Sequence, residues 1–239
     1  MKSIKVFLAS FLSVLFMVLV PLSQIHAAEG NQIGKEIKFE DGITAKTLED
    51  NEEVKKVETK DDKNIYIATY YKKTDEMKYE TYDLNRNLIE EELITDKASS
   101  EESLKVQALA ANGELIRKRT LKDVYGYWVY QSGKNIVWVT KLRDGVVKNP
   151  VEKTTNRVDL KDFKGSVDTF MNNKDQVVVK VGSGIIATIV ALYVVPEPTW
   201  TKILAGLLTI VSSAIAYAEG KAMYNAYMDS KLYYARITI

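Results

Sequence analysis

Two long apolar runs near the end of the chain constrain its fold more than any other feature of the sequence. The first run covers residues 177–195 and the second covers 203–218. The segment PEPT separates them, and Pro196 and Pro198 must interrupt a helix there. The pattern therefore predicts a hydrophobic helical hairpin, with one arm over 177–195 and the other over 200–228.

Small residues recur in both arms at spacings of three and four, which places them on common helix faces. Such faces let two helix backbones approach closely, a device that membrane helices use. We expect helix–helix packing at Ala187, Ala191, Ser212, Ala214, Ala216, Ala218 and Gly220.

Aromatic side chains bracket the tip of the hairpin at Tyr193 and Trp200, as they do at the interfaces of a bilayer. An arm of about 19 residues would span about 28 Å as a helix, close to the hydrocarbon thickness. The candidate membrane contacts are Gly184, Ile185, Ile186, Ile189, Leu192, Tyr193, Trp200, Leu204, Leu207, Leu208 and Ile210.

The same pattern also fits a buried hairpin at the centre of an α+β protein, with a sheet covering the helices. A protein that is soluble when exported and inserts later would satisfy both interpretations. In a third interpretation the hairpin tethers an exported protein to the membrane as two spans. The sequence leaves these alternatives open.

The N-terminus has the features of a secretory signal peptide over residues 1–27. Lys2 and Lys5 precede an apolar stretch over 6–20, which is short for a bilayer span, and small residues follow at Ala27 and Ala28. An uncleaved N-terminal anchor is the alternative. Cleavage after Ala27 would leave a mature protein of about 212 residues, enough for one large domain or two small ones.

The mature composition excludes several kinds of chemistry. The chain has no cysteine, and its single histidine, His26, lies in the predicted signal peptide. Without them it cannot build a Ser-His-Asp triad, a Cys-His pair or a zinc site of His and Cys. The signal holds two lysines and no acids, so 31 basic and 32 acidic side chains remain. Such a balance offers no electrostatic footprint for nucleic acid.

The central part of the chain predicts antiparallel β structure. Alternating β-branched and aromatic residues after Asn64 predict a meander whose later strands cover 77–83 and 88–94. A second hairpin joins 125–131 to 135–141 through the turn SGK, with Trp128 and Trp138 close together in its ladder. Ser99 and Glu102 fit the capping box of a short helix, and a strand over 105–109 is the alternative.

Helical periodicity begins after Val158, with one apolar stripe at Leu160, Phe163, Val167, Phe170 and Met171. The last residues alternate from Tyr233 to Ile239, which predicts a C-terminal strand. We therefore expect an α+β chain with a signal peptide at 1–27, an antiparallel β-rich region at 28–157 and a helical region at 158–239.

Three segments of the mature chain read ATYYKKTDEMKYETYD, YGYWVYQSGKNIVWV and GSGIIATIVALYVVPEPTWTKILAGLLTIVSSAIA. Together they resemble the geobacillin-twenty-six family of large, unmodified, bacteriocin-like proteins of Gram-positive bacteria. The resemblance concerns the layout of most of the mature chain. It implies a secreted protein with antibacterial activity, and it supplies no active-site residues.

The expected function is that of a secreted antibacterial protein that acts on target-cell membranes through the hairpin. The alternative is a secreted binding or structural protein with the hairpin as its buried core. We expect no enzyme, no catalytic residue, no cofactor and no metal. Acids such as Glu90, Glu91 and Glu92 form a charged run, and carboxylate catalysis needs a concave site in addition to a charge run. The target-cell membrane is the expected partner.

Overall fold

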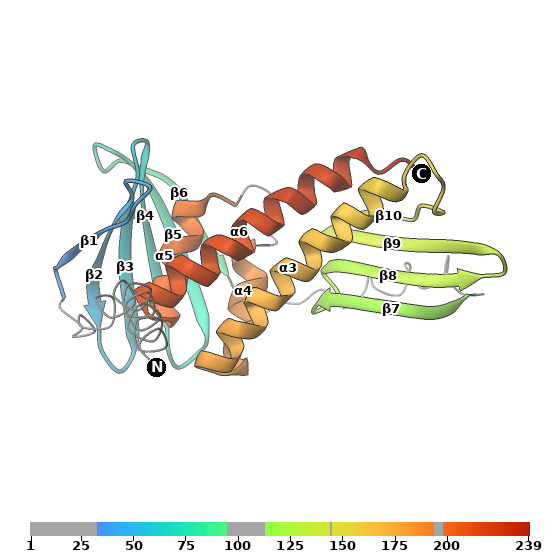
Figure 1. The fold of residues 1–239 in the computed structure, drawn as a ribbon. Helices are drawn as coiled ribbons and strands as arrows, with labels where there is room; N and C mark the ends of the chain where they lie inside the picture. The colour runs from blue at the N-terminus through green and yellow to red at the C-terminus, as the bar shows by residue number, and fades with distance from the viewer. Residues whose placement is uncertain (1–32, 95–112, 144, 194–197) are drawn as a thin grey trace, which may run out of the picture. The chain divides into compact units, whose positions relative to one another are not determined.

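The chain has an α+β fold in which two antiparallel sheets precede a set of helices (Figure 1). This computed structural model describes residues 33–94, 113–143, 145–193 and 198–239. The predicted signal peptide at 1–27, and the alternatives of a helix after Ser99 or a strand over 105–109, lie outside the described residues.

A six-stranded antiparallel meander forms from the first described strands, in the order β1-β2-β3-β4-β5-β6. The alternation read from the sequence after Asn64 is confirmed by β4, β5 and β6. Residues on both faces of β4 are buried, so this strand lies at the centre of the sheet. The strands are β1 (Glu36–Lys38), β2 (Thr44–Asp50), β3 (Val54–Lys60), β4 (Asn64–Tyr71), β5 (Glu76–Asp83) and β6 (Leu88–Ile94).

A second sheet has the order β10-β9-β8-β7, and its strands are β7 (Glu114–Leu121), β8 (Tyr125–Ser132), β9 (Asn135–Arg143) and β10 (Val146–Lys148). The predicted SGK hairpin is confirmed as β8 and β9. The predicted proximity of the two tryptophans is wrong. Trp128 pairs with Val139 and Val129 pairs with Trp138, so the two indoles lie on opposite faces of the ladder.

The helices are α3 (Arg157–Val181), the short 3₁₀ helix η1 (Ser183–Ile185), α4 (Ile186–Tyr193), α5 (Trp200–Ile210) and α6 (Ser213–Arg236). The predicted stripe from Leu160 to Met171 is confirmed, because all five of its residues are buried on α3. The helices α3 and α6 pack along each other (Figure 1). They run antiparallel, because Phe163 near the start of α3 contacts Tyr234 near the end of α6.

The first arm of the predicted hairpin is not one helix. Residues 177–181 are the last turn of α3, and the helix ends at Gly182, whose φ of 110° is a conformation that glycine adopts without strain. Conversely, the polar segment NNKD before residue 177 does not interrupt α3. Arg119 of β7 donates to Asn172 in this segment at 2.6 Å, which supports the polar residues within the helix.

The second arm is also divided. The predicted helix over 200–228 breaks at Val211 and Ser212, both of which have extended backbone. Thr199 accepts a hydrogen bond from the Lys202 N–H at 3.3 Å and so caps α5. The break allows α5 to lie on the six-stranded sheet while α6 packs along α3.

The predicted C-terminal strand is wrong, because α6 continues to Arg236 and residues 237–239 form no strand. Tyr234 is buried against Phe163, so packing on α3 favours the helix over a short alternating pattern. Lys148 of β10 donates to the carbonyl oxygens of Tyr234 and Ile237 at 2.7 and 2.8 Å, which satisfies acceptors at the end of the helix. Residues from Ile33 to Ile239 form one compact unit.

Candidate functional site

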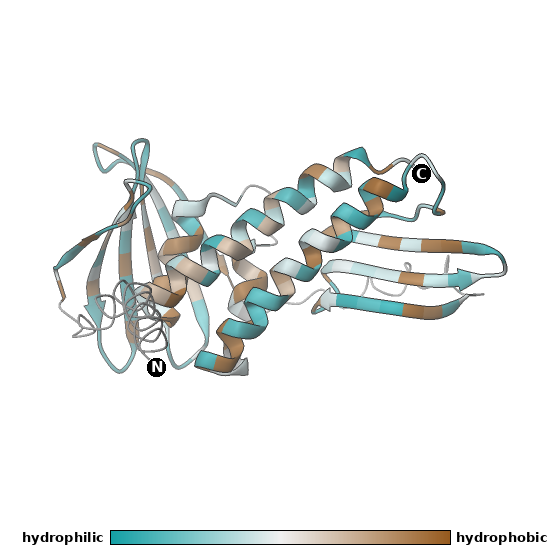
Figure 2. Cartoon of the chain, viewed as in Figure 1, coloured by the Kyte–Doolittle hydropathy of each residue, from teal (hydrophilic) through white to brown (hydrophobic). Residues whose placement is uncertain are grey.

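The apolar helices α4 and α5 are the strongest functional candidates, and most of their described residues are buried in the core. The helix α5 packs on β3 and β4 and also contacts α6. Between Trp200 and Thr209, every residue of α5 except Lys202 is buried. Figure 2 shows hydrophobic residues on α5 where it meets the six-stranded sheet. A helix that is apolar on nearly all sides requires such an enclosed position.

Three polar contacts hold the first turn of α5 against the six-stranded sheet. The Trp200 indole donates to Asp41 Oδ2 at 2.9 Å, and the Thr201 hydroxyl donates to Asp61 Oδ2 at 2.7 Å. Lys202 forms an ion pair with Glu92 of β6 at 2.7 Å. The acceptors come from the β1–β2 turn, the β3–β4 turn and an edge strand, so the start of α5 is attached at three separate points.

The surroundings of Asp61 favour its charged form, which suits an acceptor of hydrogen bonds. Burial alone would raise the pKa of its carboxyl, but hydrogen bonds from the N–H groups of Asn64 and Lys63 and from the Thr201 hydroxyl lower that pKa below the usual 3.8. Asp61 is therefore ionised at neutral pH and accepts all three hydrogen bonds as a carboxylate. The contact between Thr201 and Asp61 is accordingly charge-assisted.

The middle of α5 approaches the sheet so closely that only glycine fits. A Cβ atom at Gly206 would lie 1.6 Å from the Tyr79 hydroxyl oxygen and 2.6 Å from Cδ2 of Leu192. Tyr79 is 1% exposed, and its hydroxyl group has no hydrogen-bond partner among the described residues. Burial raises the pKa of the Tyr79 hydroxyl well above its usual value, so the ring stays neutral beneath α5.

The helix α4 contacts α3 and α6 through its last residue, Tyr193. Tyr193, at the end of α4, is fully buried, and its hydroxyl donates to the Gly220 carbonyl of α6 at 2.9 Å. Its ring meets Phe170 of α3 and Tyr227 of α6 with centroid separations of 5.1 and 6.4 Å. These edge-on contacts fix α4 against the long helix pair.

The predicted membrane contacts do not form an exposed apolar band in this structure. Most are buried, and Ile186 and Ile210 are partly buried against the same core. Gly184 lies in η1, and its surroundings fall outside the described side chains. The buried members are Ile185, Ile189, Leu192, Tyr193, Trp200, Leu204, Leu207 and Leu208.

The predicted packing residues divide in a similar way. Ala216 and Gly220 are buried on α6, and a Cβ at Gly220 would lie 2.4 Å from Cδ1 of Leu207, so this position allows α6 to approach α5. Ala218 is exposed and makes no such contribution. Ala191, Ser212 and Ala214 are half-buried, and the surroundings of Ala187 lie outside the described side chains.

Within the described ranges, no helix is both long enough and apolar enough to cross a membrane. In the same residues, no group of three or more His, Cys, Asp and Glu side chains is placed to hold a metal ion.

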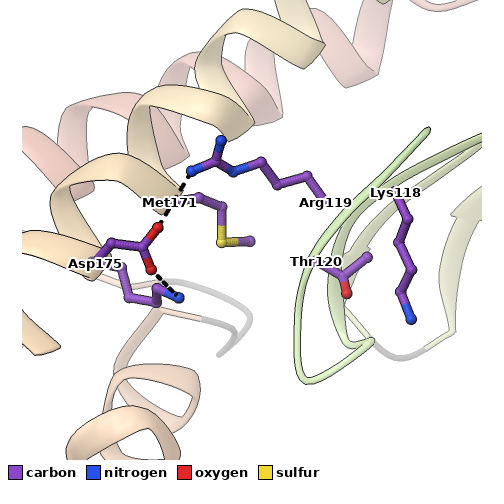
Figure 3. Close-up of a pocket in the computed structure, with 6 residues that line it drawn as sticks. Lys118, Arg119, Thr120, Met171 and Asp175 are labelled. Atoms are coloured by element: carbon purple, nitrogen blue, oxygen red, sulfur yellow. Dashed lines mark hydrogen bonds and ion pairs between the residues drawn. The ribbon is translucent and has the colours of Figure 1, made fainter. Parts of the chain in front are cut away.

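A pocket of about 430 Å³ lies between β7 and α3. Arg119 and Lys174 pair with Asp175 at its wall, at 3.4 and 2.6 Å (Figure 3). Lys118, in turn, pairs with Asp123 at 2.8 Å. The Thr120 hydroxyl, which also lines the pocket, donates to the same Asp123 carboxylate at 2.8 Å.

Sequence reasoning missed the polar groups that hold α5 on the sheet. Asp41, Asp61 and Glu92 precede α5 by more than 100 residues, and no local pattern marks them as its partners. Comparison of the chain with protein-family models, with curated proteins and with solved structures finds no match in any of the three.

Proposed function

We propose that this chain is an exported antibacterial protein that perturbs target-cell membranes with its α4–α5 segment, which the folded protein keeps buried until it meets a membrane. The observation that carries the proposal is the enclosure of a segment apolar enough to enter lipid. The resemblance to the geobacillin-twenty-six family supports an antibacterial role, and the predicted signal peptide supports export from the cell.

The lengths of the helices favour shallow insertion over a full span. The 11 residues of α5 extend about 16 Å, roughly half of the hydrocarbon thickness. The 8 residues of α4 are shorter still. We therefore propose that the segment enters one leaflet, where the polar residues Thr201 and Lys202 can stay at the headgroups.

Release requires α5 to leave the sheet, which breaks the polar contacts of its first turn and uncovers its apolar surface. The bonds to Asp41, Asp61 and Glu92 are exchanged for water, whereas the apolar surface of α5 is exchanged for lipid. In water this opening is unfavourable because it exposes the apolar face. At a membrane surface the same face is buried again, which provides the differential interaction that a conformational change needs.

Release of dye from lipid vesicles tests the proposal, with the chain expressed with its own N-terminal segment and then purified. The wild-type protein should cause leakage, and Ile210→Lys should reduce it. Ile210 is only partly buried, so a lysine there can reach water in the folded state, whereas it costs about 3 kcal/mol near the centre of a bilayer. Leu232→Lys is the matched control, because Leu232 is 49% exposed on α6, outside the segment.

Absence of leakage at every pH and lipid composition, together with no growth inhibition of related bacteria, would contradict the proposal. That result would favour the second candidate, a secreted binding or structural protein. Full burial of Tyr193 and Leu204 is the observation that favours this alternative. It predicts a soluble protein that unfolds cooperatively and does not float with vesicles in a density gradient.

A further inference from the structure

The two strands on either side of residues 95–112 have complementary sequences, and both lie at sheet edges. β6 reads LIEEELI and is the last strand of the six-stranded sheet. β7 reads ELIRKRTL and is the last strand of the four-stranded sheet. Each pairs with one neighbour among the described strands, so each presents a row of backbone groups that can pair with another strand.

Both edges expose apolar side chains next to their charges. Leu93 of β6 is 57% exposed and Ile116 of β7 is 54% exposed. Ile89 and Leu115 are exposed in the same way. Edge strands with exposed large aliphatic residues are templates for strand addition, and their charged residues decide which partner is accepted.

We infer that two copies of this chain associate by antiparallel pairing of β6 of one copy with β7 of the other. A register that places Glu91 opposite Lys118 also places Glu90 opposite Arg119 and Glu92 opposite Arg117. The register ends at Ile116, which has no partner in β8 because β7 has a bulge there. Three opposite-charge pairs therefore coincide in one alignment, and each such pair stabilises a ladder.

The side chains of this register lie on matching faces. Glu92 reaches Lys202 of α5, and Arg119 reaches Asp175 of α3 (Figure 3), so both lie on the helix-covered faces of their sheets. Glu91 pairs with Lys78 at 3.0 Å on the opposite face of the first sheet. Lys118 lies over the Trp128 ring and faces away from α3. Inner residues thus meet inner residues, and outer residues meet outer residues.

The N–H and C=O groups of β6 point in the directions that the register requires. The Asp83 N–H of β5 donates to the Asn87 carbonyl at 3.0 Å, so Asp83 points toward β6. Alternation along β5 then makes Thr81 and Tyr79 point the same way, toward their partners Glu90 and Glu92. The N–H and C=O groups of Glu91, between those two partners, point toward the free edge.

The same reasoning applies to β7. The Val124 N–H donates to the Leu121 carbonyl at 3.0 Å in the turn before β8, so Leu121 points toward β8. Alternation from Leu121 makes Arg119 and Arg117 point their backbone groups toward β8 as well, opposite Tyr127 and Val129. Lys118 therefore points its backbone groups toward the free edge, and Glu91 opposite Lys118 forms a hydrogen-bonded pair.

Charge also excludes the two homotypic pairings. An antiparallel pair of two β6 strands centred on Glu91 would set three glutamates against three glutamates. Two β7 strands centred on Lys118 would set Arg117, Lys118 and Arg119 against themselves. Like charges directly opposite each other destabilise a ladder, so the pairing of β6 with β7 is the favoured one.

Sedimentation of the purified chain at increasing concentration tests this inference, which does not depend on the proposed function. The wild-type protein should self-associate, and less so at high salt, because the pairs are exposed. Glu91→Lys and Lys118→Glu should each weaken association by roughly tenfold, since each replaces an attraction with a repulsion. Asp229→Lys and Lys134→Glu are matched controls at exposed positions away from both edges and should leave association unchanged.

Mixing the two variants gives the decisive result. The lysine introduced at position 91 of one variant faces the glutamate introduced at position 118 of the other. The mixture should therefore associate about as strongly as the wild-type protein, while each variant alone does not. Far-ultraviolet circular dichroism checks that both variants fold, and hydrogen exchange at β6 and β7 should slow as concentration rises.

A chain that stays monomeric at every concentration overturns the inference, as do variants that associate like the wild-type protein. A mixture no stronger than its components also overturns it. If the substitutions lower the unfolding midpoint of a monomer and the double charge reversal restores it, then β6 and β7 pair within one chain, and the inference is again wrong.

Discussion

The two sheets of this protein are covered by helices in different ways. The six-stranded sheet is covered by one short helix, α5, that approaches it through Gly206 and is attached by polar contacts at its first turn. The four-stranded sheet is covered by the long amphipathic helices α3 and α6 through a cluster of aromatic rings. The first sheet thus meets one helix of 11 residues, whereas the second meets two helices of 25 and 24 residues.

Because of the aromatic cluster, we expect the four-stranded sheet to resist the loss of its helices more than the six-stranded sheet does. The Tyr125 ring lies 5.1 Å from Phe170 and 5.3 Å from Tyr227, measured between centroids, and its hydroxyl donates to Ser230 at 3.0 Å. Burial raises the pKa of the Tyr125 hydroxyl far above its usual value. The folded state therefore keeps this ring neutral. Its contribution to stability is fully present below the unfolded pKa of about 10 and is lost as the pH rises from there toward the folded pKa.

The largest effect should follow from removing a ring at the junction of the two regions. Phe170 is fully buried and contacts both Tyr125 and Tyr193, so Phe170→Ala leaves a cavity and should lower the free energy of unfolding by about 3–5 kcal/mol. Denaturant unfolding measures the loss. Val158→Ala, at a 67% exposed position on the same helix, should change stability little. Equal losses at both positions would contradict the described packing.

A smaller effect should follow from adding a methyl group at the close contact between α5 and the sheet. Gly206→Ala forces a methyl group against the Tyr79 hydroxyl and should lower the free energy of unfolding by about 1–3 kcal/mol, although alanine favours a helix. Tyr79→Phe removes the clashing oxygen, which is buried without a partner among the described residues, so it should be neutral or stabilising alone.

The two substitutions should therefore be strongly non-additive. In the double variant Gly206→Ala with Tyr79→Phe, part of the stability lost through the alanine should return, as a thermodynamic cycle from thermal or denaturant unfolding can show. The rest should stay lost, because Cδ2 of Leu192 still crowds the new methyl group. Additive losses would mean that α5 does not rest on Tyr79.

The smallest effect concerns the attachment of the first turn of α5. Asp61→Asn should lower the free energy of unfolding by about 1 kcal/mol at neutral pH, since it removes the charge from a hydrogen-bonded acceptor. The pKa of Asp61 is lowered in the folded state, so its contribution is present above the unfolded value of 3.8 and is lost as the pH falls through the folded pKa. Unfolding curves from neutral pH to pH about 3 should thus converge for the two proteins. A difference that grows on acidification would contradict this role.

Local patterns predicted the strands and the first helix because those elements follow simple periods. The alternation in β4 and β5 and the stripe from Leu160 to Phe170 each depend on residues that are near neighbours in the sequence. The breaks in the hairpin were harder to predict. The break at Gly182 could have been predicted, because glycine tolerates a positive φ and often ends a helix. The extended backbone at Val211 has no such local cause, because it results from the packing of α5 and α6 against different partners.

The environment of the hairpin could not be predicted from its sequence at all. A helix that is apolar on all sides suits a protein core and a bilayer equally well. Contacts from distant segments decide between them, such as the hydrogen bond from Thr59 of β3 to the Thr201 carbonyl at 3.0 Å. The same holds for Asp61 and Glu92, which are ordinary surface acids by sequence and become partners of α5 only in the folded protein.

The depth of α5 in a membrane is the measurement that tests the central claim most directly. The chain has no cysteine, so Ile210→Cys on α5 and Leu232→Cys on α6 each provide one site for a fluorescent label. With lipid vesicles, quenchers attached to the acyl chains should reduce the fluorescence at position 210 and leave that at position 232 unchanged. Equal fluorescence at position 210 with and without these quenchers would contradict membrane insertion and leave α5 as a permanent part of the core.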